Sequence, residues 1–190
     1  FTIDYARRFN KHNVGGMLLY TQREYKNDVL PSRNQGVSGR ATYDYDQRYL
    51  FEFNFGYNGT ERLGKGDRFE FFPAVSLGWL VSNEKFFEPL SDVVSSLKLR
   101  GSYGLVGSDE TGPSGAPHFL YIDQVQVTGN GRPGFTTGEN LNVSYYGPVV
   151  QQWAVQNGGW ERVKKLDVGF DMELFRELSI TFDFFYDKRY

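Results

Sequence analysis

Strict alternation between apolar and polar residues is the feature that most limits what this chain can fold into. In the clearest run, residues 49–57, aromatic side chains occupy every second position, and only Leu50 breaks the polar or small set between them. A repeat of two residues places alternate side chains on opposite faces of a β-strand. The same pattern recurs along the chain and predicts eight strands, over residues 1–9, 13–22, 37–46, 49–57, 69–81, 97–107, 165–174 and 178–187.

The lengths of the connections carry a second signal. In an antiparallel sheet every second connection lies at the same end, and transmembrane barrels have short periplasmic turns and longer extracellular loops. If the first strand runs toward the periplasm, the periplasmic turns are short, at residues 10–12, 46–48 and 175–177. The outer loops are long, at 23–35, 61–67 and 108–160. One periplasmic connection, 82–96, departs from this rule, and its Glu-Lys-Phe-Phe run predicts a short structured cap.

The make-up of the apolar faces favours lipid over a protein core as their partner. Aromatic residues form 17% of the chain, with 17 Phe and 13 Tyr. The core of a β-sandwich needs side chains of different sizes that pack closely against one another, whereas lipid tails impose no such packing rule. Tyr49, Tyr57, Trp79 and Tyr186, near strand ends, are placed to reach the headgroup level. The expected fold is all-β, an antiparallel transmembrane barrel segment of about eight strands that forms an arc of a larger barrel.

Charge, cysteine and histidine content argue against several other functions. The net charge is -2, and Lys and Arg are interspersed among Asp and Glu, so the sequence has no basic stripe that could follow the phosphates of a nucleic acid. The chain has no cysteine, and its two histidines, His12 and His118, have no carboxylate at ligand spacing. We therefore expect no enzyme, no cofactor and no metal site.

Several runs resemble the barrel of the SusC/RagA family of TonB-dependent outer-membrane transporters, and the likeness covers nearly the whole chain. The runs are FEFFPAVSLGW at 69–79, NEKFF at 83–87, LKLRGSYG at 97–104, ATYDY at 41–45, RYL at 48–50, WE at 160–161 and KLDVGFD at 165–171.

This resemblance implies the C-terminal part of a large barrel in the outer membrane of a Gram-negative, Bacteroidota-like cell. Residues 1–190 would be partial barrel with a long extracellular loop at 108–160, and the plug domain would lie outside them. The family pairs with a SusD-like surface lipoprotein, is energised by TonB through the missing N-terminal part, and imports oligosaccharides or peptides. Two other interpretations stay open at this stage, a soluble carbohydrate-binding β-sandwich and a small outer-membrane porin or enzyme barrel.

Candidate site residues fall into two groups. Aromatic side chains of the long loop have the flat faces that stack on sugar rings, although such residues also pack loops or meet partner proteins. Cationic side chains on the polar faces would line the barrel interior and touch the plug or the cargo. The loop candidates are Tyr121, Tyr145, Tyr146, Trp153 and Trp160, and the lumen-facing candidates are Arg40, Lys98 and Arg100.

Overall fold

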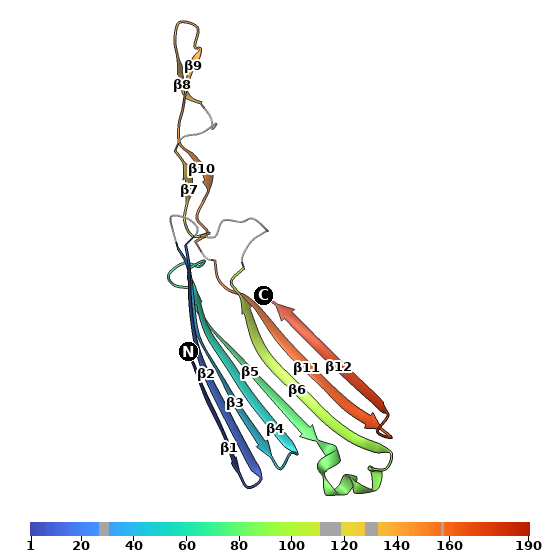
Figure 1. Ribbon diagram of the computed structural model, residues 1–190. Helices are drawn as coiled ribbons and strands as arrows, with labels where there is room; N and C mark the ends of the chain where they lie inside the picture. The colour runs from blue at the N-terminus through green and yellow to red at the C-terminus, as the bar shows by residue number, and fades with distance from the viewer. Residues whose placement is uncertain (27–30, 111–118, 128–132, 157) are drawn as a thin grey trace.

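A computed structural model describes residues 1–26, 31–110, 119–127, 133–156 and 158–190. Its main body is one antiparallel sheet in which each strand lies beside its neighbour in the chain, except that β11 follows β6 (Figure 1). The order is β1-β2-β3-β4-β5-β6-β11-β12, and all eight predicted strands are confirmed. Their bounds are β1 Thr2–Phe9, β2 His12–Tyr25, β3 Ser32–Tyr45, β4 Tyr49–Thr60, β5 Phe69–Leu80, β6 Val94–Ser108, β11 Glu161–Leu174 and β12 Leu178–Arg189.

The strands are longer than the alternation predicts, most clearly at β2 and β3. These two strands pair as far as Tyr25 and Ser32, through residues that are polar on both faces. Gln22 faces Gln35 across the pair, and Arg33 and Glu24 form an ion pair at 3.2 Å. Such a segment has no hydrophobic alternation, so only the backbone ladder and cross-strand polar contacts mark it as strand.

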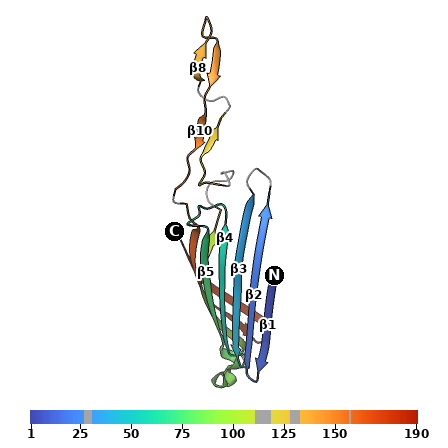
Figure 2. The ribbon, with the colours of Figure 1, turned by 90° about the vertical axis from the view of Figure 1, so that its left-hand side faces the viewer.

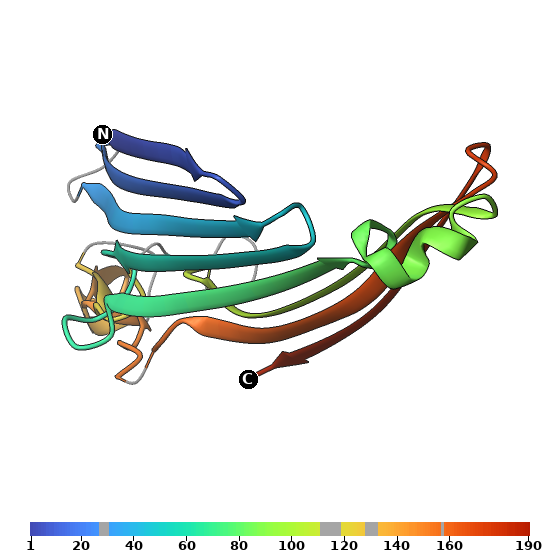
Figure 3. The same cartoon turned by 90° about the horizontal axis from the view of Figure 1, so that it is seen from below.

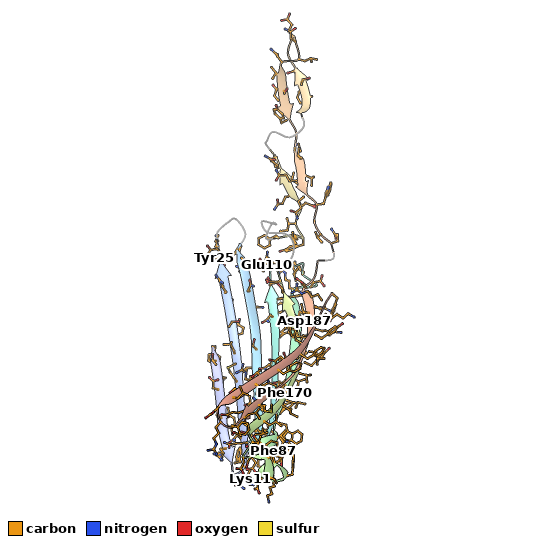
Figure 4. All side chains as sticks on the ribbon, turned by 90° about the vertical axis from the view of Figure 1, so that its right-hand side faces the viewer. Lys11, Tyr25, Phe87, Glu110, Phe170 and Asp187 are labelled. Carbon is orange, nitrogen blue, oxygen red and sulfur yellow. The ribbon has the colours of Figure 1, made fainter. Side chains whose placement is uncertain are left out.

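The short turns and a small helical segment share one end of the sheet, and the long loops share the other (Figure 1). Figure 4 shows Lys11 and Phe87 at the first end and Tyr25 and Glu110 at the second. Two short 3₁₀ helices, η1 (Val81–Asn83) and η2 (Lys85–Leu90), form the predicted structured cap between β5 and β6.

The tight hairpins depend on left-handed backbone at their turns. Asp46 and Gln47 have φ values of 53° and 54°, and Phe175 and Arg176 have 55° and 59°. Paired positive φ angles match the right-handed twist of the flanking strands. Aspartate tolerates this conformation, whereas phenylalanine does not favour it. The Phe175 amide donates to the Val93 carbonyl at 3.0 Å, which helps to hold that turn in place.

The long loop contains an arm of two small hairpin-like sheets that extends beyond the sheet end (Figures 1 and 2). These strands were not predicted, because runs of three to five residues carry too little periodicity. β7 (Gln124–Gln126) pairs with β10 (Val149–Gln152), and β8 (Pro133–Thr137) pairs with β9 (Val143–Tyr146).

The described residues do not enclose a hydrophobic core of ordinary size. Their buried hydrophobic side chains are Leu63, Phe72, Val81 and Phe87. The chain exposes 13889 Å² to solvent, against about 9,300 Å² for a compact monomer of 21.9 kDa. No helix within the described ranges has the length and apolar character needed to cross a bilayer. The sheet is twisted and open, and its free edges are β1 and β12 (Figure 3).

Candidate functional site: the two faces of the sheet and the long loop

One face of the sheet is apolar without interruption from β3 to β12. Strand register decides this, because residues that pair directly across a ladder point to the same face. Phe51 pairs with Tyr43 and with Leu77, and the same row then passes to Gly101, Val168 and Phe184. The adjacent row on the same face is Tyr45, Tyr49, Trp79, Leu99, Phe170 and Phe182.

This apolar face is left uncovered. Leu77 is 61% exposed and Phe184 is 57% exposed. Besides the main sheet, the only sheets among the described residues are the two small ones of the arm. A β-sandwich buries such a face against a second large sheet. The soluble-sandwich interpretation therefore lacks the partner sheet that it requires.

The opposite face is polar, and it holds the three cationic candidates. Lys98 and Arg100 line a hollow of about 830 Å³, whose other lining residues come from β1 to β6 and include Asp167 of β11. Arg40 is not among the lining residues, but it lies on the same face, two positions before Thr42, which does line the hollow. The Arg40 guanidinium donates to Asn54 Oδ1 at 3.0 Å and lies 3.6 Å from Glu52. Arg40 is therefore already bound to polar side chains of β4, the neighbouring strand.

Arg100 is the centre of the densest charge cluster on this polar face. Its guanidinium lies 3.7 Å from Asp167 and 3.2 Å from Asp171, and it also pairs with Asp183. These carboxylates belong to β11 and β12, so one side chain connects three strands. Three carboxylates around one guanidinium give this cluster a net negative charge. The clearest role of its ion pairs is to hold β6, β11 and β12 together.

The five aromatic candidates of the long loop separate into packed and exposed residues. Trp160 packs edge-on against Phe72 with ring centroids 5.2 Å apart, and its Nε1 donates to the Arg68 carbonyl at 3.3 Å. The Tyr121 hydroxyl accepts a hydrogen bond from Arg68 at 3.3 Å. These two residues fix the roots of the arm on the sheet.

Trp153, Tyr145 and Tyr146 stand out from the arm. Trp153 is 74% exposed, and the two tyrosines are 52% and 53% exposed. Tyr145 stacks on Phe135, with ring centroids 4.8 Å apart and planes at 15°. These three side chains are therefore the ones of the five that present a free surface to a ligand or partner.

Sequence reasoning missed the residues that anchor the arm. Arg162 of β11 reaches across β6 to Glu70 of β5, at 2.6 Å. Its register partner on β6 is Gly107, where a Cβ would collide with the Phe72 ring. The β5–β6 ladder ends at Ala74 and Gly104, next to Pro73, which has no amide to donate. Side-chain contacts therefore join β5, β6 and β11 beyond the point where β5–β6 backbone pairing ends. The sequence pattern could not reveal these contacts, because the residues that make them are far apart in the sequence.

An aromatic row crosses the sheet at the short-turn end. The rings of Tyr45, Tyr49 and Trp79 stack in sequence, with centroids 6.3 and 6.4 Å apart. Glu84, in the connection after β5, accepts from Trp79 Nε1 at 3.3 Å and lies 3.4 Å from Arg48. Hydrogen bonds from Tyr49 and Trp79, with the charge of Arg48, hold the pKa of Glu84 below its ordinary value.

Of the two histidines, only His12 belongs to the described residues. His12 lies at the same end, and its Nδ1 is 2.8 Å from the Tyr43 hydroxyl. His118 lies outside the described residues. Within the described ranges, no three His, Cys, Asp or Glu side chains are grouped so as to hold a metal ion.

No protein-family model matches the chain. Among curated proteins it is 30% identical to TonB-dependent receptor P39 of Formosa agariphila over 96% of its length. It is 28% identical to TonB-dependent receptor P3 of the same organism over 90%. It is also 32% identical to TonB-dependent receptor SusC of Bacteroides thetaiotaomicron over 80% of its length. The chain spans only 15–16% of these relatives.

Solved structures give the same fold. The chain superimposes over 99% of its length on the RagAB peptide importer in the closed-closed state, with a TM-score of 0.79 and 18% identity. A second structure, of the RagAB peptide transporter, gives a TM-score of 0.77 and 19% identity. The matched part is 23% of each solved chain, so the chain has the fold of one stretch of a larger body.

Proposed function

We propose that this chain, which belongs to the SusC/RagA family of TonB-dependent receptors, forms part of the barrel wall of an outer-membrane nutrient importer. The observation that carries the proposal is the uninterrupted apolar face, uncovered on one side of the sheet and backed by a charged face on the other. Acyl chains would cover the first face and the barrel interior would lie against the second. The free edges of β1 and β12 would pair with further strands.

A barrel wall also suits the size of the exposed surface. The excess over a compact monomer is about 4,600 Å² by the scaling of surface with mass. Leaving so much surface in water would forfeit about 25 cal/mol for each apolar Å². Lipid on one face and neighbouring strands on both edges would remove most of that cost.

The arm is proposed as the contact with an outer partner. Trp153, Tyr145 and Tyr146 are exposed at the loop end, which would face the cell exterior if the short turns lie in the periplasm. A SusD-like surface lipoprotein is the partner that the family implies, with an oligosaccharide or peptide as cargo and TonB acting through a part outside this chain. We assign no catalytic role to the chain.

Cell fractionation of the full-length protein tests the membrane assignment. We expect the protein in the outer-membrane fraction, retained after alkaline carbonate washing and released only by detergent. Recovery in the aqueous fraction without detergent would overturn the proposal.

Co-purification tests the partner contact. The triple variant Trp153→Ala, Tyr145→Ala and Tyr146→Ala should reduce recovery of a surface lipoprotein. Lys65→Ala, in the neighbouring outer loop, is the matched control.

A further inference from the structure

The helical connection between β5 and β6 has a buried side and an apolar exposed side. We call residues 81–93 the foot. Val81 and Phe87 are 7% and 5% exposed, so they pack inward. Phe86, Leu90 and Val93 are 65%, 53% and 47% exposed. Three large apolar side chains directed away from the protein are unusual in a connection that meets only water.

Polar contacts fix the orientation of the foot on the sheet. Asn83 Nδ2 donates to the Gln47 carbonyl at 2.7 Å, and the Glu84 carboxylate pairs with Arg48 at 3.4 Å. On the other side, the Val93 carbonyl accepts from the Phe175 amide at 3.0 Å. The foot is therefore bonded to the turns on both sides, and its exposed apolar side has a set direction.

At Phe86, this exposed apolar side continues the apolar face of the sheet. The Phe86 ring packs edge-on against Trp79, with centroids 6.5 Å apart and planes at 61°. Trp79 belongs to the aromatic row on the apolar face, where it stacks on Tyr49. Phe86 thus lies on the same side as the proposed lipid-facing surface and opposite to the charged face with Arg100.

We propose that the foot lies against the phospholipid interface at the short-turn end of the barrel, with Phe86, Leu90 and Val93 inserted at the headgroup level. The inference rests on the proposed function, since it needs a lipid-facing sheet. Apolar and aromatic side chains next to a membrane-spanning surface gain free energy by entering the interface. The foot carries Glu84, Glu88 and Asp92 against the single cation Lys85. Its attachment should therefore depend on apolar burial and not on attraction to anionic lipid.

Site-directed fluorescence tests this inference in the full-length protein, reconstituted in phosphatidylcholine vesicles. This stretch has no cysteine, so a cysteine at Phe86 or Leu90, in a background without other cysteines, can carry an environment-sensitive NBD label. We expect blue-shifted emission and stronger quenching by a lipid nitroxide near the headgroup than by one near the chain end. Raising the salt concentration should not change that quenching.

Three reference labels make the outcome decisive. Glu88→Cys gives an exposed position on the same foot, Lys65→Cys reports water at the loop end, and Phe182→Cys reports the apolar face. Lipid quenching at Phe182 and Phe86, with little at Glu88 and Lys65, supports the foot as an interfacial anchor. Quenching at Phe182 but not at Phe86 or Leu90 overturns the inference and leaves the barrel assignment intact. Absence of lipid quenching at Phe182 would instead overturn the proposed function.

Discussion

At the scale of single residues, neighbours in sequence belong to different environments. Val75 pairs with Phe53 and Tyr103 on the apolar face, whereas Ser76 pairs with Glu52 and Ser102 on the polar face. The two differ by one position and share the same strand. The loss of unfolding free energy on introducing a charge should therefore differ sharply between the two positions.

A lysine scan of this adjacent pair measures that contrast. Val75→Lys places an ammonium group among acyl chains and should cost about 2–4 kcal/mol of unfolding free energy. Ser76→Lys gains Glu52 as a neighbour and should stay within about 0.5 kcal/mol of the wild type. Urea unfolding in phospholipid vesicles reports both values. Equal losses at the two positions would contradict the assignment of the faces.

A carboxylate at the short-turn end should make stability depend on pH. Because the folded pKa of Glu84 is lowered, its contribution is complete above the unfolded carboxyl value of about 4.3. It declines as pH falls through the lower folded pKa. The difference in unfolding free energy between wild type and Glu84→Gln should be constant from pH 7 to pH 5 and then shrink. Glu88→Gln, at an exposed position of the same segment, is the control for the loss of one negative charge.

At the scale of elements, the alternation predicted which residues form strands and which face each side chain takes. It did so because one face of most strands is mainly apolar, as in Tyr49–Thr60. The early part of β3 was missed because Asn34, Gln35 and Gly36 carry no apolar alternation, although they pair with both neighbouring strands. The candidate site was less predictable. Arg68 and Arg162 find partners 53 and 92 positions away, and no local pattern encodes contacts of that separation.

The attachment of the arm to the sheet gives the prediction at this scale. Arg68 donates to the Tyr121 hydroxyl, and its carbonyl receives Trp160 Nε1, so it joins both roots of the arm. Arg68→Ala removes the side-chain contact and should widen the distance distribution between spin labels at Ser144 and Glu177. Lys65→Ala, an exposed cation in the same loop, should leave it unchanged. Identical distributions for both variants would show that Arg68 does not hold the arm.

At the scale of the whole molecule, the sheet separates two kinds of ends. Short hairpins and the foot lie at one end, and the arm and long loops lie at the other (Figure 1). A transmembrane barrel with this asymmetry places its short turns in the periplasm. The apolar–polar alternation alone cannot decide this orientation. If the periplasmic and extracellular ends were exchanged, every residue would still lie on the same face of the sheet.

Thiol accessibility in intact cells decides the orientation. Lys65 is exposed in the loop before β5, and Glu177 is exposed in the turn before β12, at opposite ends of the sheet. In a background without other cysteines, Lys65→Cys should react at once with a membrane-impermeant maleimide added outside. Glu177→Cys should react only after the outer membrane is permeabilised, because the bilayer and barrel would separate that turn from the reagent. Immediate labelling at Glu177 together with protection at Lys65 would place the arm in the periplasm, where no surface lipoprotein could meet it.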